Sequence, residues 1–594
     1  MNDSRALETQ QHCSQQQFKD SLAISFGGYS TKGDKSENQD AFALKMSEGL
    51  DLELKGHVAV IADGVSSANC AAKASQMSVC HFIEEYLATP ETWSVNKSAA
   101  KVISSLNNWL YSRQLVADGK GLSEQWFSTF SAVVLKGDRA HIFHIGDCQI
   151  AKINSDGYQA LTKDHATISG TLNRALGAGS HIEIDHSSCP LAPQDILMLS
   201  CDGVHQFVKP KQVRKILKEN INLEQASKAI SQLASEQGSQ DNLTCLLIKV
   251  EQLPQQAFSQ LVFTRLQQVI PPALRLGSKL DHFEILDVLH QTSRSHVYLA
   301  KDLLDKKLVV IKIPSVNFTD DNDYLSSFIK EGWIGDKISH PAIMKIYPSV
   351  IKSKFLYHVC EYIEGQTLAA WMKDNPNPPL IKVRDILDQL IKVLRVLQRQ
   401  DIIHCDIKGD NFIIDGHGRI KLIDFGSSYA GAVMDNSFAE KAEQEPSTPT
   451  FNPGTLNYSA PELFYGQENN HQSELYSLAV MVYQMLTNRL PYKEISQFDA
   501  IPKQYNLWRY KAIVTYRKDL PNYMDRVMSK ALAANPTNRY EHYSEFIAEF
   551  NVNDKNQLNV QHNTPLLERD PVKFWQGISG ILLLVLISVL LFKS

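Results

Sequence analysis

The sequence predicts a multidomain chain in which a strand-rich first domain is followed by a second domain with two lobes. Its 594 residues exceed what one hydrophobic core organises, so two or three domains are expected. Short apolar strands alternate with turns and two helical stretches over residues 21–250. Over residues 281–552 strands come first and amphipathic helices follow, which is typical of two lobes.

Three further segments are expected to lie outside these two domains. Residues 1–20 are polar, lack the hydrophobic run of a signal peptide and are expected to be a disordered lead-in. Residues 251–280 contain LPQQAF and VIPPALRLGS, whose prolines and lost periodicity are typical of an interdomain linker. Residues 553–573 are polar and predict a tether.

Composition restricts the function further. A net charge of −5 gives no electrostatic case for binding nucleic acid. The nine cysteines show neither metal-binding nor paired spacing, which favours a reducing compartment.

A membrane anchor is predicted at residues 574–592, which carry no charge. At about 1.5 Å per residue, a helix of this length just covers a hydrocarbon core of about 30 Å. Trp575 would lie at the interface, with Arg569 and Lys573 on the side of the domains, as the positive-inside tendency favours. We therefore expect a single transmembrane helix; the alternative is a buried helix of a soluble domain.

Five aspartates of the first domain stand beside turns and apolar strands. A carboxylate at a strand end is held rigidly yet can face a cleft, and several converging there repel one another unless divalent cations neutralise them. Two Mg²⁺ or Mn²⁺ ions at such a site can bind a phosphate and activate a bridging water. Any single Asp-Gly pair is also explained by a hairpin turn. The sites are Asp40 in ENQD, Asp63 in IADGV, Asp147 in IGDC, Asp202 in LSCDGV and Asp241 in QDNLT.

In this order the five sites resemble the metal-dependent Ser/Thr protein phosphatases of the 2C type, over residues 21–250. The resemblance implies an α/β/β/α sandwich, a pair of sheets flanked by helices. It also implies that Asp63 bridges two metal ions, that Asp40 orients metal-bound water and that Asp147 serves a third metal. The metal shells would be completed by Gly64, Asp202 and Asp241.

Three positions depart from the 2C pattern. Lys35 stands where the family usually has the arginine that grips the substrate phosphate, so the charge is kept but the bidentate geometry is lost. Gln39 replaces a frequent glutamate, and Val65 stands where some members have a histidine. These changes predict weaker rather than absent activity.

The second domain carries residues suited to phosphoryl transfer. Lys312 in LVVIKIP needs a partner carboxylate to hold it against nucleotide phosphates, and Glu331 on the following helical stretch can supply it. In HCDIKGDN, Asp406 is placed to accept a hydroxyl proton and Lys408 to neutralise the γ-phosphate. Adenine contacts are expected at Glu361 and Tyr362, and Mg²⁺ ligands at Asn411 and Asp424, the latter in DFG.

This series, with APE at residues 460–462, resembles the eukaryotic-like Ser/Thr protein kinases and implies an α+β bilobal fold that binds ATP and Mg²⁺. In that family Arg539 would pair with the glutamate of APE. There are departures. The phosphate-covering loop lacks glycine, with His290, Thr292 and Ser295 at the three positions, which predicts weaker nucleotide binding. Cys405 replaces the arginine that clamps a phosphorylated activation loop, and Glu474 replaces the anchoring aspartate.

We therefore expect a bifunctional enzyme that phosphorylates Ser/Thr proteins, itself among them, and dephosphorylates phosphoserine and phosphothreonine. Residues Ser447, Thr448 and Thr450 are candidate autophosphorylation sites. By analogy we expect a bacterial inner membrane, with both domains in the cytoplasm. The alternatives are an active phosphatase regulated by a nucleotide-binding pseudokinase, or a membrane scaffold without turnover.

Overall fold

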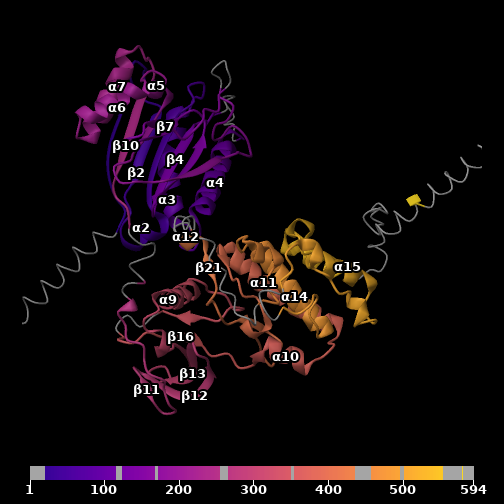
Figure 1. Ribbon diagram of the computed structural model, residues 1–594. Coiled ribbons are helices and arrows are strands. Elements are labelled where there is room, and N and C mark those ends of the chain that lie inside the picture. The colour runs from indigo at the N-terminus through magenta and orange to yellow at the C-terminus, as the bar shows by residue number, and fades with distance from the viewer. Residues whose placement is uncertain are drawn as a thin grey trace, which may run out of the picture.

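The computed structural model describes residues 21–115, 124–166, 172–254, 262, 265–348, 353–434, 456–495, 501–552 and 578–579. Figure 1 shows two bodies of different architecture, an N-terminal domain rich in strands and a C-terminal domain of two lobes. The two meet around helix α12 (Gly431–Met434) of the C-terminal domain and helix α2 (Gly49–Lys55) of the N-terminal domain.

Two five-stranded antiparallel sheets form the N-terminal domain. The first has the order β1 (Ala23–Thr31), β10 (Leu243–Gln252), β9 (Ile196–Ser200), β6 (Gln149–Ile153), β7 (Tyr158–Ala160). The second has the order β2 (Asp40–Lys45), β3 (His57–Asp63), β4 (Phe130–Lys136), β5 (Arg139–Ile145), β8 (Asp185–Pro190).

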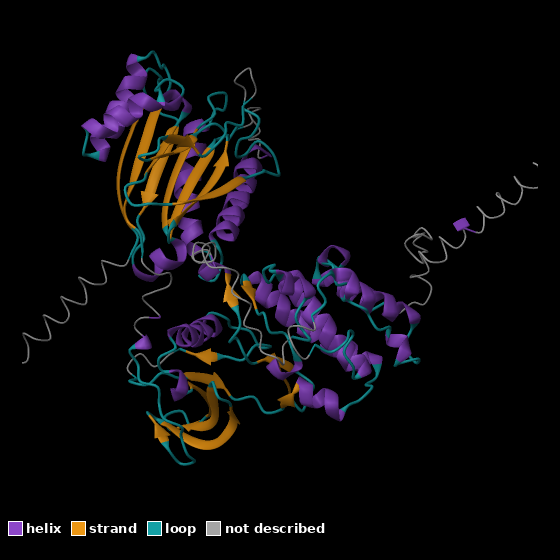
Figure 2. Cartoon of the chain, in the orientation of Figure 1, coloured by secondary structure: helices purple, strands orange, loops and turns teal. Residues whose placement is uncertain are grey.

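Helices cover the outer faces of both sheets, as Figure 2 shows. Strand β3 illustrates why, because successive side chains point to opposite faces. Val58 and Val60 pack towards α3 (Ala71–Ala88) and α4 (Val95–Leu115), whereas Ala59 and Ile61 belong to the core shared with the first sheet. The first sheet is covered by α5 (Asp202–His205), α6 (Pro210–Glu219) and α7 (Leu223–Glu236). This is the predicted α/β/β/α sandwich.

A twisted sheet and one long helix form the smaller lobe of the C-terminal domain. The sheet has the order β11 (Lys279–Leu280), β12 (Phe283–Gln291), β13 (Ser295–Asp302), β14 (Leu308–Pro314), β16 (His358–Glu361), β15 (Ile346–Tyr347). Helix α9 (Asn322–Asp336) follows the short 3-10 helix η1 (Val316–Phe318).

The larger lobe is helical around one core. Helix α11 (Leu380–Arg399) buries residues at spacings of three and four, for example Val383, Ile386, Leu390 and Leu394, which makes one apolar stripe. Helix α14 (His471–Thr487) is buried almost all round and runs through the centre. Around them lie α10 (Leu368–Asp374), α15 (Asn522–Ala531), α16 (Tyr543–Phe550) and the 3-10 helices η3 (Pro461–Tyr465), η5 (Tyr505–Leu507), η6 (Ile513–Thr515) and η7 (Pro536–Asn538).

Two small sheets line the boundary between the lobes. One joins β17 (Gln366–Thr367), β19 (Phe412–Ile414) and β20 (Ile420–Leu422), with η2 (Gly409–Asn411) just before β19. The other pairs β18 (Ile402–Ile403) with β21 (Tyr429–Ala430). These short strands present the loops that carry HCDIKGDN and DFG.

Part of the segment predicted as a linker belongs to the smaller lobe instead. Val262, Leu266 and Ile270 pack against the cluster that contains the apolar face of α9. Val269 exchanges backbone hydrogen bonds with the β15–β16 connection, its N–H donating to the Lys354 carbonyl at 2.8 Å. The apolar residues recur four apart, a helical spacing that the neighbouring prolines hid. The correction is that the lobe begins within residues 251–280.

Within the described part of the chain, no helix is long and apolar enough to span a membrane. Of the predicted span at residues 574–592, only residues 578 and 579 are described. The lead-in, the tether and the three candidate autophosphorylation sites also lie outside the described residues.

Two candidate active sites

The five aspartates of the N-terminal domain converge at one edge of the sandwich. Strands β2 and β3 place Asp40 directly opposite Asp63. Asp147 follows β5, Asp202 begins α5 after β9, and Asp241 precedes β10, which pairs with β9. Sequence reasoning placed these residues at strand ends, and the antiparallel register brings those ends together.

The aspartates influence one another strongly. Burial raises the pKa of Asp63 well above its usual range, and the charges of the other four aspartates raise it further. Burial also raises the pKa of Asp40 to about 6 and that of Asp147 to about 7, with Asp202 adding repulsion to both. Such a cluster of buried like charges is unfavourable without compensating positive charge.

One positive charge already reaches the cluster. The ammonium of Lys35 lies 2.9 Å from Asp241 Oδ1. This hydrogen bond raises the pKa of Lys35, and attraction to Asp63 and Asp202 adds to the effect. Lys35 therefore supplies one positive charge to the carboxylate cluster.

The donor set fits hard divalent cations. Among the described residues, Asp40 Oδ1 and Asp147 Oδ1 are buried oxygens without a hydrogen-bond partner. At Gly64 an added Cβ would lie 2.5 Å from the Ala71 carbonyl oxygen, so only glycine fits beside Asp63. In the same part of the chain, however, no three His, Cys, Asp or Glu side chains are arranged around a single ion position. Cations would complete the cluster by drawing the carboxylates together.

Sequence reasoning missed the residues that position the aspartates. Asn242 is buried; its Oδ1 accepts from the Gln39 N–H at 2.8 Å, and its amide donates to the Lys32 and Glu37 carbonyls. The Thr244 hydroxyl donates to Asp40 Oδ2 at 2.7 Å. Asn242 stands inside QDNLT beside Asp241, yet only the fold shows that it ties the β1–β2 connection to β10.

The second candidate site is centred on Lys312 of β14. Its ammonium lies 2.5 Å from Glu331 Oε1 on α9 and 3.0 Å from Asp424 Oδ1. Burial would lower the pKa of Lys312, but attraction to Asp424 and Glu331 raises it instead. Burial raises the pKa of Glu331 to about 7, whereas attraction to Lys312 outweighs burial at Asp424 and holds its pKa well below the usual range. Lys312, Glu331 and Asp424 are therefore brought together as predicted.

The residues of the HCDIKGDN loop lie close together, next to the group formed by Lys312, Glu331 and Asp424. Lys408 Nζ lies 2.7 Å from Asp406 Oδ2, and the Asn411 amide donates to the same oxygen at 3.0 Å. The His404 ring contacts the Asp424 carbonyl, with Nε2 at 2.5 Å from the oxygen. The loop thus holds the base candidate, the lysine and both predicted Mg²⁺ ligands in one network.

Glu474 anchors this loop from below despite its extra methylene. Its Oε1 accepts a hydrogen bond from the His404 N–H at 2.5 Å, and the Tyr543 hydroxyl donates to its Oε2 at 3.3 Å. At the neighbouring position, burial raises the pKa of the Cys405 thiol. A thiol carries no positive charge, so Cys405 cannot form the ion pair by which an arginine would bind a phosphorylated loop.

The predicted adenine-contacting residues lie where β16 leaves the sheet. The Glu361 side chain is turned to Lys421, with Oε1 and Nζ 2.5 Å apart, and its N–H donates to the Lys345 carbonyl at 2.8 Å. Tyr362 directly follows the strand. The side chain and the backbone N–H of Glu361 are therefore both engaged within the protein.

The glycine-free hairpin between β12 and β13 is stabilised by its own polar groups. Thr292 Oγ1 accepts from the Ser295 N–H at 3.0 Å. The Arg294 carbonyl at the tip accepts from the Ser315 N–H at 2.7 Å and from the Tyr324 hydroxyl on α9 at 2.5 Å. The Thr292 side chain thus closes the turn in the absence of glycine, and the Tyr324 hydroxyl ties the hairpin backbone to α9, features that the sequence alone did not show.

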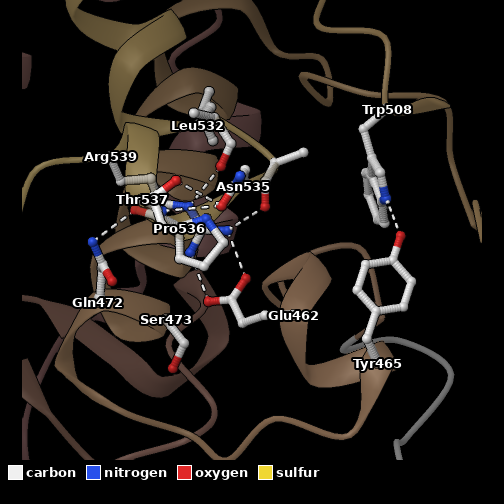
Figure 3. Close-up of polar contacts among 12 residues, drawn as sticks. Glu462, Tyr465, Gln472, Ser473, Trp508, Leu532, Asn535, Pro536, Thr537 and Arg539 are labelled. Atoms are coloured by element: carbon white, nitrogen blue, oxygen red, sulfur yellow. Dashed lines mark hydrogen bonds and ion pairs between the residues drawn. The ribbon is translucent and has the colours of Figure 1, made fainter. Parts of the chain in front are cut away.

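An ion pair predicted from the APE motif is fully buried (Figure 3). The Arg539 guanidinium donates to Glu462 Oε1 at 2.7 Å and to Oε2 at 2.6 Å, a bidentate arrangement. Arg539 also donates to the Ala533 and Ala534 carbonyls. The prediction of this pair is confirmed.

Comparisons with known proteins match the two domains separately. The family model described as protein phosphatase 2C matches residues 27–247, and that described as protein kinase domain matches residues 283–548. Serine/threonine-protein kinase PrkC of Bacillus subtilis is 26% identical over 291 residues, covering 49% of this chain and 43% of PrkC. PknB of Mycolicibacterium smegmatis is 29% identical over 276 residues, covering 45% and 42% respectively. The chain thus spans less than half the length of these curated relatives.

Solved structures are similar to each part separately. A serine/threonine phosphatase of S. agalactiae is 21% identical, with a TM-score of 0.35, and matches 39% of this chain over 100% of its own. The kinase domain of PknI from Mycobacterium tuberculosis is 21% identical, with a TM-score of 0.35, and matches 47% of this chain over 98% of its own. By the family models, one chain carries a protein phosphatase 2C domain at residues 27–247 and a protein kinase domain at residues 283–548.

Proposed function

We propose that the protein is a bifunctional enzyme that adds phosphate to Ser/Thr side chains and removes it again. The observation that supports this most strongly is the assembly of Lys312, Glu331 and Asp424 in a protein that also carries the five-aspartate cluster. In this arrangement Glu331 holds Lys312 beside the predicted Mg²⁺ ligand Asp424, as phosphoryl transfer from ATP requires.

In the kinase domain the residues are placed for phosphoryl transfer from ATP. Mg²⁺, held by Asp424 and the Asn411 amide oxygen, would neutralise the phosphate charge. Lys312 binds and orients the nucleotide phosphates, and Glu331 fixes the lysine. Asp406 orients the substrate hydroxyl and accepts its proton, while Lys408, 2.7 Å from Asp406 Oδ2, balances charge at the transferred group.

In the phosphatase domain Asp63, Gly64, Asp202 and Asp241 would hold two Mn²⁺ or Mg²⁺ ions, with Asp147 serving a third. The ions supply charge compensation and a nucleophilic water when bound. Asp40, aligned by the Thr244 hydroxyl, orients that water. Lys35 binds the substrate phosphate as a single point charge, without the two-pronged geometry of arginine.

We further propose that residues 574–592 anchor the enzyme in a bacterial inner membrane, with both domains in the cytoplasm. The support is the uncharged apolar run, together with the bacterial origin of the relatives. An anchor would raise the effective concentration of membrane-bound substrates. Expression with and without residues 574–592, followed by carbonate extraction of membranes, tests this: the intact chain stays in the pellet, and equal extraction of both forms would refute it.

Labelled ATP with Mg²⁺ tests the paired activities. Asp63→Ala should raise the phosphate that accumulates on the protein, because removal is blocked, and Asp406→Ala should abolish it. No incorporation in the Asp63→Ala protein would refute the kinase half. Manganese-dependent hydrolysis of a phosphothreonine peptide by the Asp406→Ala protein tests the other half independently.

The glycine-free hairpin supports a second candidate function, a phosphatase regulated by a pseudokinase that binds nucleotide without transferring phosphate. Thr292 and Ser295 carry side chains where glycine lets the backbone approach phosphates closely. ATP binding without incorporation, together with phosphopeptide hydrolysis that depends on ATP, would favour this alternative. Absence of both incorporation and hydrolysis would leave only a scaffold.

A further inference from the structure

The phosphatase domain and the kinase domain cap each other's helices. Helix α11 ends at Arg399, where backbone carbonyls lack partners within the helix. The Trp93 indole N–H donates to the Arg399 carbonyl at 2.7 Å, and the Lys97 ammonium donates to the Gln398 carbonyl at 2.8 Å. A cation at this position also suits the negative end of the helix dipole. The phosphatase domain thereby completes the C-terminus of α11.

The reciprocal cap involves Asp401 of the kinase domain. Its Oδ2 accepts from the Ser94 N–H at 2.8 Å, directly before α4 begins at Val95, and its Oδ1 lies 3.4 Å from Lys97 Nζ. A carboxylate at a helix N-terminus is stabilised by the helix dipole. The two domains therefore meet through specific, mutually satisfied polar groups at helix ends.

A second contact holds the segment that follows DFG. The Ala432 N–H on α12 donates to the Thr92 carbonyl at 3.0 Å, and the Lys136 ammonium donates to the Ala432 carbonyl at 2.6 Å. Lys136 is fully buried. At Gly431 an added Cβ would lie 2.1 Å from Asp401 Oδ2 and 3.0 Å from the Ser94 nitrogen, so this approach leaves no room for a side chain.

A third contact reaches α9, the helix that carries Glu331. Lys337, immediately after α9, lies 3.1 Å from Glu91 Oε2 of the phosphatase domain. Leu54 of α2 is part of the buried kinase core cluster. The domain junction therefore contacts the three elements that assemble the kinase site: α9, the turn before the catalytic loop, and the start of the segment after DFG.

We propose that the phosphatase domain is a built-in activating subunit of the kinase domain. Docked, it holds α9 and α12 in the arrangement in which Lys312 contacts both Glu331 and Asp424. This takes the place of the arginine–phosphate clamp that Cys405 does not allow. The inference rests on the proposed kinase activity and concerns how that site is regulated.

The junction is separate from the phosphatase site, which makes the idea testable within one molecule. Strand β4 begins next to Asp63, whose N–H donates to Thr129 Oγ1, and ends at Lys136 in the junction. At about 3.3 Å per residue the two ends lie roughly 20 Å apart. Charge changes at the junction should therefore leave phosphate hydrolysis intact.

The test is a double charge reversal, Glu91→Lys with Lys97→Glu, which repels Lys337 and Asp401 and leaves the net charge unchanged. The matched control reverses two exposed charges on α3 and α4, the helices on either side of Glu91, namely Glu84→Lys with Lys101→Glu. Each pair is made in the full chain, in detergent, with the Asp63→Ala change so that no phosphate is removed. Transfer of label to myelin basic protein is measured, together with hydrogen exchange of amides 427–434.

We expect the junction variant to lose about tenfold or more in kinase rate and to exchange faster at residues 427–434, because each reversed charge then faces a like charge across the junction. The control should stay within about twofold of the parent. With Asp63 restored, both variants should hydrolyse p-nitrophenyl phosphate with Mn²⁺ at the parent rate.

An unchanged or raised kinase rate in the junction variant would overturn the proposal. So would loss of p-nitrophenyl phosphate hydrolysis in that variant, because the junction would then maintain the phosphatase fold rather than serve the kinase site. Failure of the proposed function has a different signature, since the Asp63→Ala parent would itself transfer no label.

Discussion

Removing one partner of the buried pair of Arg539 and Glu462 should be among the most destabilising single changes in the kinase domain. Their side chains are 0% and 1% exposed, and Arg539 also donates to two backbone carbonyls. Arg539→Ala would leave a carboxylate and two carbonyls buried without their donors. Removing one partner of a buried pair costs about 3–5 kcal/mol.

The chain offers a control with the same residue type and a similar distance. Arg419 Nε lies 2.7 Å from Asp415 Oδ2, but the Arg419 side chain is 75% exposed. Solvent screening limits the contribution of such a pair to within about 1 kcal/mol. The contrast between Arg539→Ala and Arg419→Ala therefore isolates the effect of burial.

Calorimetry of the full chain measures both variants, with the phosphatase transition as an internal reference. At about 2–4 °C per kcal/mol for a domain of this size, Arg539→Ala should lower the kinase midpoint by roughly 6–20 °C and Arg419→Ala by less than about 4 °C. Equal midpoints for the two variants would refute the assignment of stability to the buried pair.

Three further predictions follow from the two sites. Glu331→Gln should lower the kinase rate about ten- to a hundredfold without changing p-nitrophenyl phosphate hydrolysis, because Lys312 loses a charged partner; an unchanged rate would contradict this. Asn242→Ala should destabilise the phosphatase domain by about 3 kcal/mol, measured by calorimetry, since three backbone groups lose their partner; a change below about 1 kcal/mol would argue against that role. In EDTA the unfolding midpoint temperature of the phosphatase domain should fall as the pH rises from about 4 to about 7, because burial raises the pKa of Asp40 to about 6 and that of Asp147 to about 7 in the folded state, so that their protonated forms stabilise the fold only at the lower pH. Mn²⁺ should restore the unfolding midpoint temperature at the higher pH. A midpoint temperature that rises with pH in EDTA would contradict the raised pKa values of Asp40 and Asp147.

Much of both sites could be predicted from the sequence because local patterns carry them. Asp63 stands at the end of an apolar strand, and the spacing from HCDIKGDN to DFG fixes Asp406 relative to Asp424. Once the strands pair in register, the geometry of the sheets brings these residues close together. The pairing of Arg539 with Glu462 was likewise readable from a motif.

Other features arise from contacts that no short motif contains. Trp93 and Asp401 lie about 300 residues apart in the sequence, and their role as helix caps exists only once both domains are folded. Asn242 looks like a turn residue until its three backbone partners are seen. The prolines near Ile270 suggested a free linker, whereas burial against α9 shows that tertiary packing outweighs local propensity there.

The opposed activities are measured most directly with two variants that each lack one activity. One variant is labelled by its own kinase domain, and the other removes the label. The Asp63→Ala protein is first labelled with γ-labelled ATP and freed of nucleotide, then mixed with Asp406→Ala protein and Mn²⁺. We expect labelled inorganic phosphate to be released only when the second protein is present and the metal is not chelated. Label that never enters the first protein, or never leaves it in the presence of the second, would contradict the pairing of a kinase and a phosphatase in this chain.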